Sequence, residues 1–163
     1  APPLRLKRPH DAWLFVDLEK AKAKRREDGL SLDGYGTLKF QLYFGAARAN
    51  LYVHAWNNPL KVSLERVSTH HRDSVVSNLR DGEVKKTKKV RVGKQVGTYY
   101  EISGNVADPR DNTKLKAITI LTAAAYREAD KAVVTLELRF DANNKRAKEL
   151  AKDFKKLLKK AKF

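Results

Sequence analysis

Residues 114–163 read KLKAITILTAAAYREADKAVVTLELRFDANNKRAKELAKDFKKLLKKAKF, and this closing stretch decides the expected fold. It begins with two strand-like runs, residues 114–125 and 131–141, separated by a short polar turn. The first run is apolar on both alternating sides, which is typical of a central strand covered on both faces. The second alternates an apolar side with one that carries Glu137 and Arg139, so one buried and one wetter face are expected. Together the runs predict a hairpin around which an antiparallel sheet is built.

The chain then ends in a lysine-rich segment with the pattern of an amphipathic helix. Asp141 stands where a helix N-cap belongs, because its carboxylate can accept from free backbone N–H groups. The apolar residues fall on one helical stripe, formed by Leu150, Phe154, Leu157, Leu158 and Ala161. We expect this helix, residues 141–163, to pack on the sheet with its lysines in solvent. A basic helix that binds a membrane surface or a polyanion is the alternative.

The rest of the chain adds shorter strands and a second helix. Alternation predicts strands at residues 4–8, 13–18, 37–44, 49–56, 97–106 and the second half of 83–94. Residues 63–79 carry an apolar stripe behind Ser63 as N-cap, and 19–28 have helix-forming composition that predicts an exposed helical turn or two. Residues 31–36 and 108–113 are expected to be loops. The pattern predicts a single α+β domain over 1–163, with about six to eight mostly antiparallel strands sandwiched by helices.

Charge is the strongest global feature of the sequence. The chain has 163 residues, with 35 Lys and Arg against 19 Asp and Glu, a net charge of +16. A surface of one sign points to an anionic partner such as nucleic acid, acidic lipid or an acidic protein. Hydrophobic residues make up 42% and charged residues 33%, which is typical of a globular protein, and no apolar run reaches the ~20 residues of a membrane span.

The absence of cysteine excludes disulfides and thiolate metal sites, and it is compatible with export. The sequence begins Ala-Pro-Pro without an initiator Met, which is typical of a mature chain left by signal-peptide removal or of a fragment cut at a chosen boundary. We therefore expect an exported protein, periplasmic or extracellular, with a peripheral membrane location as a variant of this prediction.

Two basic clusters are the candidate binding sites. The first comprises Lys85, Lys86, Lys88, Lys89, Arg91 and Lys94. The second comprises Lys152, Lys155, Lys156, Lys159, Lys160 and Lys162. Solubility is served as well by a surface of mixed sign, so we expect these clusters to contact an anionic partner by long-range attraction. An acidic protein surface or larger complex is the expected partner, with an anionic membrane surface or nucleic acid as alternatives.

No pattern of catalytic or cofactor-binding residues is present. The chain lacks GxSxG, Walker A, GxGxxG and HExxH sequences, and adjacent His70 and His71 would project about 100° apart on a helix. No metal or cofactor is expected, and His71 is interpreted as a partly buried residue of the helix stripe. The aromatic residues alternate with apolar neighbours on predicted strands, so packing is favoured over base stacking. The sequence predicts a non-enzymatic accessory or binding protein; a nucleic-acid-binding protein, or an enzyme or small-molecule-binding protein with an unrecognised pocket, are the alternatives.

The order of elements also resembles a known fold. The resemblance rests on Arg8-Pro9, on Trp13-Leu14-Phe15, on the helix at 63–79, on the paired aromatics of 97–101, on the hairpin at 114–140 and on a closing helix that ends at Phe163. This layout resembles the PsbP-like fold, found in extrinsic photosystem PsbP proteins, a Ran-binding nuclear import factor and bacterial exported domains. The resemblance implies an α/β/α arrangement and a non-enzymatic docking role. Photosystem PsbP proteins are less basic, so neither a photosystem role nor a family site is carried over.

Overall fold

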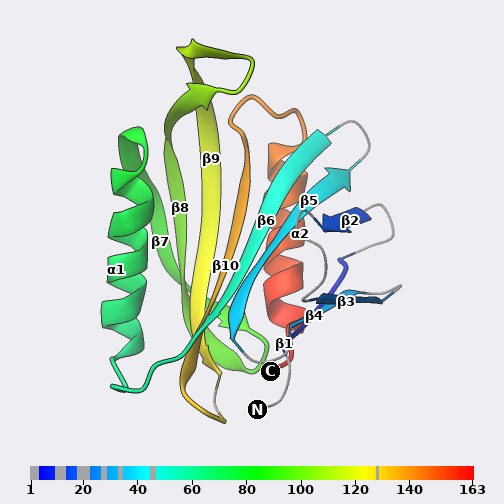
Figure 1. The fold of residues 1–163 in the computed structure, drawn as a ribbon, viewed down its shortest axis with the longest axis vertical. Coiled ribbons are helices and arrows are strands. Elements are labelled where there is room, and N and C mark those ends of the chain that lie inside the picture. Colours follow the sequence, from blue (N-terminus) through cyan, green and yellow to red (C-terminus); the bar gives the residue numbers. More distant parts are fainter. Residues whose placement is uncertain are drawn as a thin grey trace.

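A computed structural model describes residues 4–9, 14–17, 23–26, 29–32, 35–44, 47–127 and 129–163. Its strands are β1 (Leu4–Lys7), β2 (Leu14–Asp17), β3 (Ala23–Arg26), β4 (Gly29–Leu32), β5 (Gly36–Phe44), β6 (Ala47–Trp56), β7 (Arg80–Val92), β8 (Gln95–Asp108), β9 (Asp111–Arg127) and β10 (Ala132–Asp141). Its helices are α1 (Leu64–Ser77) and α2 (Ala147–Lys160). A seven-stranded sheet has the order β2-β5-β6-β10-β9-β8-β7, and a three-stranded sheet has the order β1-β4-β3 (Figure 1).

Every strand pair in the two sheets is antiparallel, so the predicted α+β class with a mostly antiparallel sheet is confirmed. The two helices lie on opposite faces of the large sheet (Figure 1). Tyr100 and Ile102 of β8 pack with Val75 of α1. Tyr99 points to the opposite side of β8 and packs in the cluster that contains Phe154 of α2. Alternation along each strand thus sends successive side chains into two separate cores.

The predicted central hairpin is confirmed. β9 pairs with β10 along its second half and with β8 on its other side, and both faces of that second half are largely buried. Ile120 belongs to the core under α1, and Leu121 and Ala123 belong to the core under α2. The double-sided apolar pattern of this run follows from its place between two helical layers.

The prediction of a wetter face on β10 is wrong for Thr135 and Glu137, which are 1% and 3% exposed. β10 lies between β6 and β9 near the middle of the sheet, and His71 of α1 reaches across to this face. The polar residues are therefore covered, and only Arg139 on that side retains substantial exposure.

The closing helix is docked as predicted, with Leu150, Phe154, Leu157 and Leu158 all buried. Its predicted start is wrong, because α2 begins at Ala147 and not at Asp141. Asp141 instead accepts a hydrogen bond from the backbone N–H of Asn143 at 2.9 Å, which stabilises a turn. An Asx-type turn offers the same carboxylate a local alternative to a helix cap.

The helical prediction for residues 19–28 is wrong where the structure describes this segment, since Ala23–Arg26 form β3 and pair with β4. That segment has no apolar stripe to bury, so pairing with a neighbouring strand outweighs its helix propensity. β4 likewise includes the first two residues of the predicted loop at 31–36. β7 starts at Arg80, earlier than predicted, and Asp111 already belongs to β9, so the predicted loop at 108–113 is a shorter turn. The part of the predictions that involves Trp13 lies outside the described residues.

α1 confirms the predicted second helix. The Ser63 hydroxyl accepts from the backbone N–H of Arg66 at 3.3 Å, as expected of an N-cap. The helix packs mainly against β7, β8 and β9, and its His71 also contacts Glu137 of β10. The start of β6 and the end of β10 on the same face border the pocket described below.

Candidate functional site

The two predicted basic clusters come together at one edge of the large sheet. β7 is an edge strand, and α2 packs beside it. The ammonium nitrogens of Lys88 and Lys155 lie 5.2 and 5.6 Å from the centre of the same Tyr99 ring. Residues 67 positions apart in sequence are thus brought to one place, which the sequence did not predict.

We define the basic face as Lys86, Lys88, Lys152, Lys155 and Lys159. Lys86 and Lys88 are cross-strand partners of Glu101 and Tyr99, so they share the α2 side of the sheet. Lys152 and Lys159 precede and follow Lys155 by three and four residues, and so lie on the same side of α2. Glu101 is the acid that shares this side of β8.

The other predicted lysines and arginines lie outside the basic face. Lys89 and Arg91 alternate with Lys88 on β7 and therefore point to the opposite side of the sheet. Lys85 pairs with Glu83 at 2.8 Å. The remaining members are exposed at the β7–β8 turn, on the flank of α2 away from Lys155 or after the end of α2: Lys94, Lys156, Lys160 and Lys162. The structure therefore assembles some members of each cluster and separates the rest.

Like charges on the basic face repel one another. The adjoining Lys155 ammonium, followed by partial burial and by Lys86, lowers the pKa of Lys88 below its ordinary value. Tyr99 beneath these lysines is fully buried, and burial raises the pKa of its hydroxyl. Its ring attracts both cations from below but is not accessible for stacking on a nucleic-acid base. The expected packing role of the aromatic residues is confirmed for Tyr99 and Tyr100, while Trp56 and Tyr35 are about half exposed.

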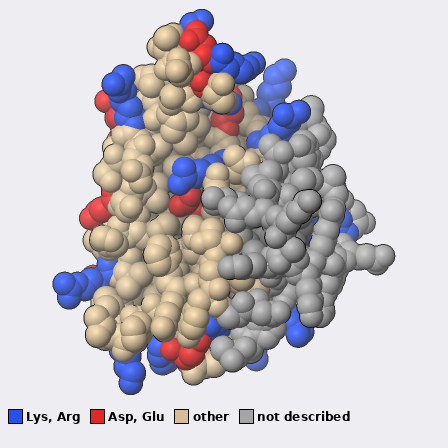
Figure 2. All heavy atoms as spheres, in the orientation of Figure 1, with Lys and Arg blue, Asp and Glu red and all other residues tan. Residues whose placement is uncertain are grey.

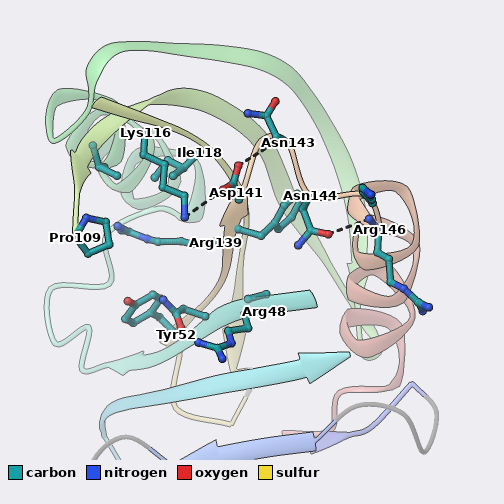
Figure 3. A pocket seen from close by; sticks show the side chains of 15 residues that line it. Arg48, Tyr52, Pro109, Lys116, Ile118, Arg139, Asp141, Asn143, Asn144 and Arg146 are labelled. Atoms are coloured by element: carbon teal, nitrogen blue, oxygen red, sulfur yellow. Dashed lines mark hydrogen bonds and ion pairs between the residues drawn. The ribbon is translucent and has the colours of Figure 1, made fainter. Parts of the chain in front are cut away.

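A pocket that sequence analysis missed lies on the other face of the sheet. Figure 2 shows that charged side chains on this face lie mainly around its edges, apart from a small group near the middle. The pocket has a volume of about 800 Å³ and lies between the start of β6, the β8–β9 turn and the loop from β10 to α2 (Figure 3). Its lining contains five cations and one acid, namely Arg48, Lys116, Arg139, Lys145, Arg146 and Asp141.

Arg139 is held in this pocket by the buried carboxylate of Glu137. Its Nε lies 2.6 Å from Oε2 of Glu137, and its guanidinium lies 5.2 Å from the centre of the Tyr52 ring. The other carboxylate oxygen, Oε1, lies 3.4 Å from Nε2 of His71, whose Nε2 also contacts Thr122 at 3.1 Å. Burial pushes the pKa of Glu137 upward, but the contacts from His71 and Arg139 together outweigh it and leave this pKa below its usual value.

Lys116 is held in a similar way by Asp141, with 3.1 Å between Nζ and Oδ2 (Figure 3). The N–H of Asn143 is the main cause that lowers the pKa of Asp141, and Lys116 lowers it further against partial burial. The pocket residues come from 48–52, 106–118 and 139–146, which no local spacing connects. The one signal in the sequence that could have indicated the pocket was the pair Glu137 and Arg139, which share one side of a strand whose other side is apolar.

Other classes of site find no support in the part of the chain that the structure describes. No group of three His, Cys, Asp or Glu residues among the described positions is placed to hold a metal ion. His71 lies in the predicted helix stripe with 15% of its side chain exposed, which confirms its interpretation as a partly buried residue. Among the described residues, neither helix has the length and apolar character needed to cross a bilayer.

Comparison with known proteins adds a likeness of fold. No family model matches the chain, and no curated protein matches it either. Among solved structures, protein PA94 of Pseudomonas aeruginosa, a protein of unknown function suggested to be a regulator, resembles it with a TM-score of 0.56 at 10% identity. The match covers 85% of this chain and 90% of PA94. At this identity the likeness shows that the two chains share a fold.

Proposed function

We propose that this chain is a non-enzymatic binding protein that docks through its basic face onto an acidic protein complex or envelope surface. The observation that carries the proposal is the position of Lys88 and Lys155 over one Tyr99 ring. Two separate basic segments are thereby joined into one surface with few acids. Export, expected from the sequence, remains part of the proposal.

The electrostatics of the basic face favour an anionic partner. Lys155 lowers the pKa of Lys88, which means that the two ammonium groups raise each other's free energy when both are charged. An approaching carboxylate or phosphate relieves this repulsion. Contact with the buried Tyr99 ring restricts the rotamers of Lys88 and Lys155, which would otherwise sample many conformations. If the protein had no anionic partner, the lysines of edge strand β7 would serve to prevent edge-to-edge aggregation of the sheet.

We further propose that the arrangement is PsbP-like. The order of strands and helices along the chain and the position of one helix on each face of a central sheet support this proposal. The proposed docking role agrees with what that resemblance implies.

The proposal is tested by salt titrations of binding to an acidic protein, anionic vesicles, duplex DNA and single-stranded RNA. One variant carries glutamine at Lys88, Lys152, Lys155 and Lys159. The matched control carries glutamine at Lys89, Lys114, Lys156 and Lys160. These lysines lie outside the basic face, and their replacement removes the same amount of charge. Exposed ion pairs contribute roughly 0.2–1 kcal/mol each, so the basic-face variant should lose about 0.8–4 kcal/mol of binding free energy, roughly 4-fold to 1,000-fold in Kd.

The control variant should retain most of the wild-type affinity. If both variants weaken binding equally, net charge and not the basic face is responsible, and the proposed site is wrong. If the wild type binds none of the four probes at low salt, the docking function itself fails. Selective binding to duplex DNA, with a logarithmic salt slope near −0.9 per phosphate neutralised, would instead establish the nucleic-acid alternative.

A further inference from the structure

The pocket on the opposite face has a chemistry of its own. It lies over β6 and β10, whereas the basic face lies along β7 and α2. Its five cations and single acid leave a charge of +4. Glu137 and Glu149 pair with Arg139 and Arg146 from outside the lining, and counting both still leaves +2. The pocket therefore stays positive when these two ion pairs are counted.

Arg139 has the properties of a prepared anion ligand. Glu137, 3% exposed, fixes the guanidinium through Nε, and the Tyr52 ring lies against it. The terminal Nη atoms make no hydrogen bond to any residue that the structure describes, and 36% of the side chain is exposed. An arginine fixed on one edge with its other donors accessible suits an oxyanion, because the planar fork matches carboxylate and phosphate oxygens.

Lys116 supplies a second fixed cation from the neighbouring strand β9. Asp141 contacts its Nζ at 3.1 Å and is itself held by the N–H of Asn143 at 2.9 Å. In Figure 3, Lys116 and Arg139 extend into the same space from adjacent strands. Each cation is thus anchored by an acid, and less side-chain entropy is lost when a ligand binds.

The remaining walls are partly apolar. Ile118 of β9 and Val106 of β8 belong to the cluster on the α1 side of the sheet, and Pro109 contributes from the turn that follows β8. A volume of about 800 Å³ lies within the range of small-molecule sites. A bare inorganic ion would leave these walls uncovered, whereas an organic anion would contact them.

We propose that this pocket binds a small organic anion, with its oxyanion group on Arg139 and Lys116 and its apolar body against Val106, Pro109 and Ile118. The oxyanion is a carboxylate or a phosphate ester, which these two cations would recognise by the same contacts. This binding is separate from docking through the basic face.

Calorimetric titration of the full chain with hexyl phosphate, hexanoate, inorganic phosphate and hexanol tests the proposal. Hexyl phosphate or hexanoate should bind with a Kd at or below about 1 mM, and whichever binds more tightly identifies the oxyanion. Arg139→Gln should weaken this binding at least tenfold, and Lys116→Gln should weaken it severalfold. Arg66→Gln, an exposed change of equal charge on α1, should leave it unchanged.

Circular dichroism establishes whether each variant is folded. If Arg139→Gln does not fold, Lys116→Gln still tests the proposal. The proposal is overturned if neither organic anion binds, if inorganic phosphate or hexanol binds as tightly as they do, or if Arg66→Gln weakens binding as much as the pocket variants. The basic-face variant should retain hexyl phosphate binding, and Arg139→Gln should retain docking. Failure of one proposal is therefore distinguishable from failure of the other.

Discussion

Replacement of Glu137 by glutamine should reveal a charged carboxylate buried beneath the pocket. The change keeps the shape of the side chain but removes the ionic partner of Arg139, whose Nε lies 2.6 Å away. A hydrogen bond to a charged group contributes about 1.5–3 kcal/mol. Arg139 is 36% exposed and can be solvated after the change, and glutamine still offers one acceptor oxygen, so we reduce this figure to about 1–2 kcal/mol.

The pH dependence follows from the direction of the pKa shift. The pKa of Glu137 lies below its ordinary value in the folded protein, so folding is stabilised by the charged form. This stabilisation is complete above the unfolded pKa of about 4.3 and is lost as the pH falls through the lower folded pKa. Glutamine does not titrate. The stability difference between wild type and Glu137→Gln should therefore be largest near neutral pH and should shrink in acid.

Urea unfolding and thermal melts at about pH 7 and about pH 3 provide the measurement. For a chain of this size, about 1–2 kcal/mol corresponds to a Tm lower by roughly 2–8 °C at neutral pH. Glu65→Gln, at an exposed position in the first turn of α1, is the matched control and should have little effect at either pH. An equal penalty at both pH values, or a stabilised glutamine variant, would refute the charged state of Glu137 and with it the anchoring of Arg139.

Three further changes test the packing that positions both sites. Phe154→Ala should destabilise the protein by about 3–5 kcal/mol in urea unfolding, since the ring is fully buried under α2. Gly93→Ala should cost at least about 1–3 kcal/mol, because φ is +62° and a Cβ would lie 2.3 Å from the carbonyl oxygen of Ala161, while Lys94→Ala in the same turn should be nearly neutral. Ser63→Ala should cost about 1 kcal/mol by thermal melting, because it removes the N-cap of α1, and Ser63→Asp should restore most of it.

Local pattern was sufficient for most of the secondary structure. The alternation in β5, β6, β9 and β10 and the stripe of α2 predicted elements that the structure contains, because period-two and period-3.6 patterns reflect which side of an element is buried. The Ser63 cap is likewise a contact within one turn of helix. Such features depend on neighbours in sequence, so the sequence alone determines them.

Long-range contacts decided what the pattern could not. Ala23–Arg26 form a strand because they pair with β4. Asp141 stabilises a turn and not the start of a helix. Glu137 was expected on a wetter face, yet a central strand position and His71 of α1 cover it. Burial of a polar group depends on what lies above the sheet, which alternation along one strand does not encode.

The candidate sites show the same division. The sequence identified the lysines of β7 and α2 from their local density, and it did not reveal that Lys88 and Lys155 share one Tyr99 ring. The pocket was invisible because its residues come from three distant stretches, 48–52, 106–118 and 139–146. Strand order and the position of α1, which contacts β7 to β9 and leaves the start of β6 and the end of β10 to the pocket, brought these stretches together. Composition fixes how much positive charge the chain carries, but the packing of helices on the sheet determines where an anion can meet it.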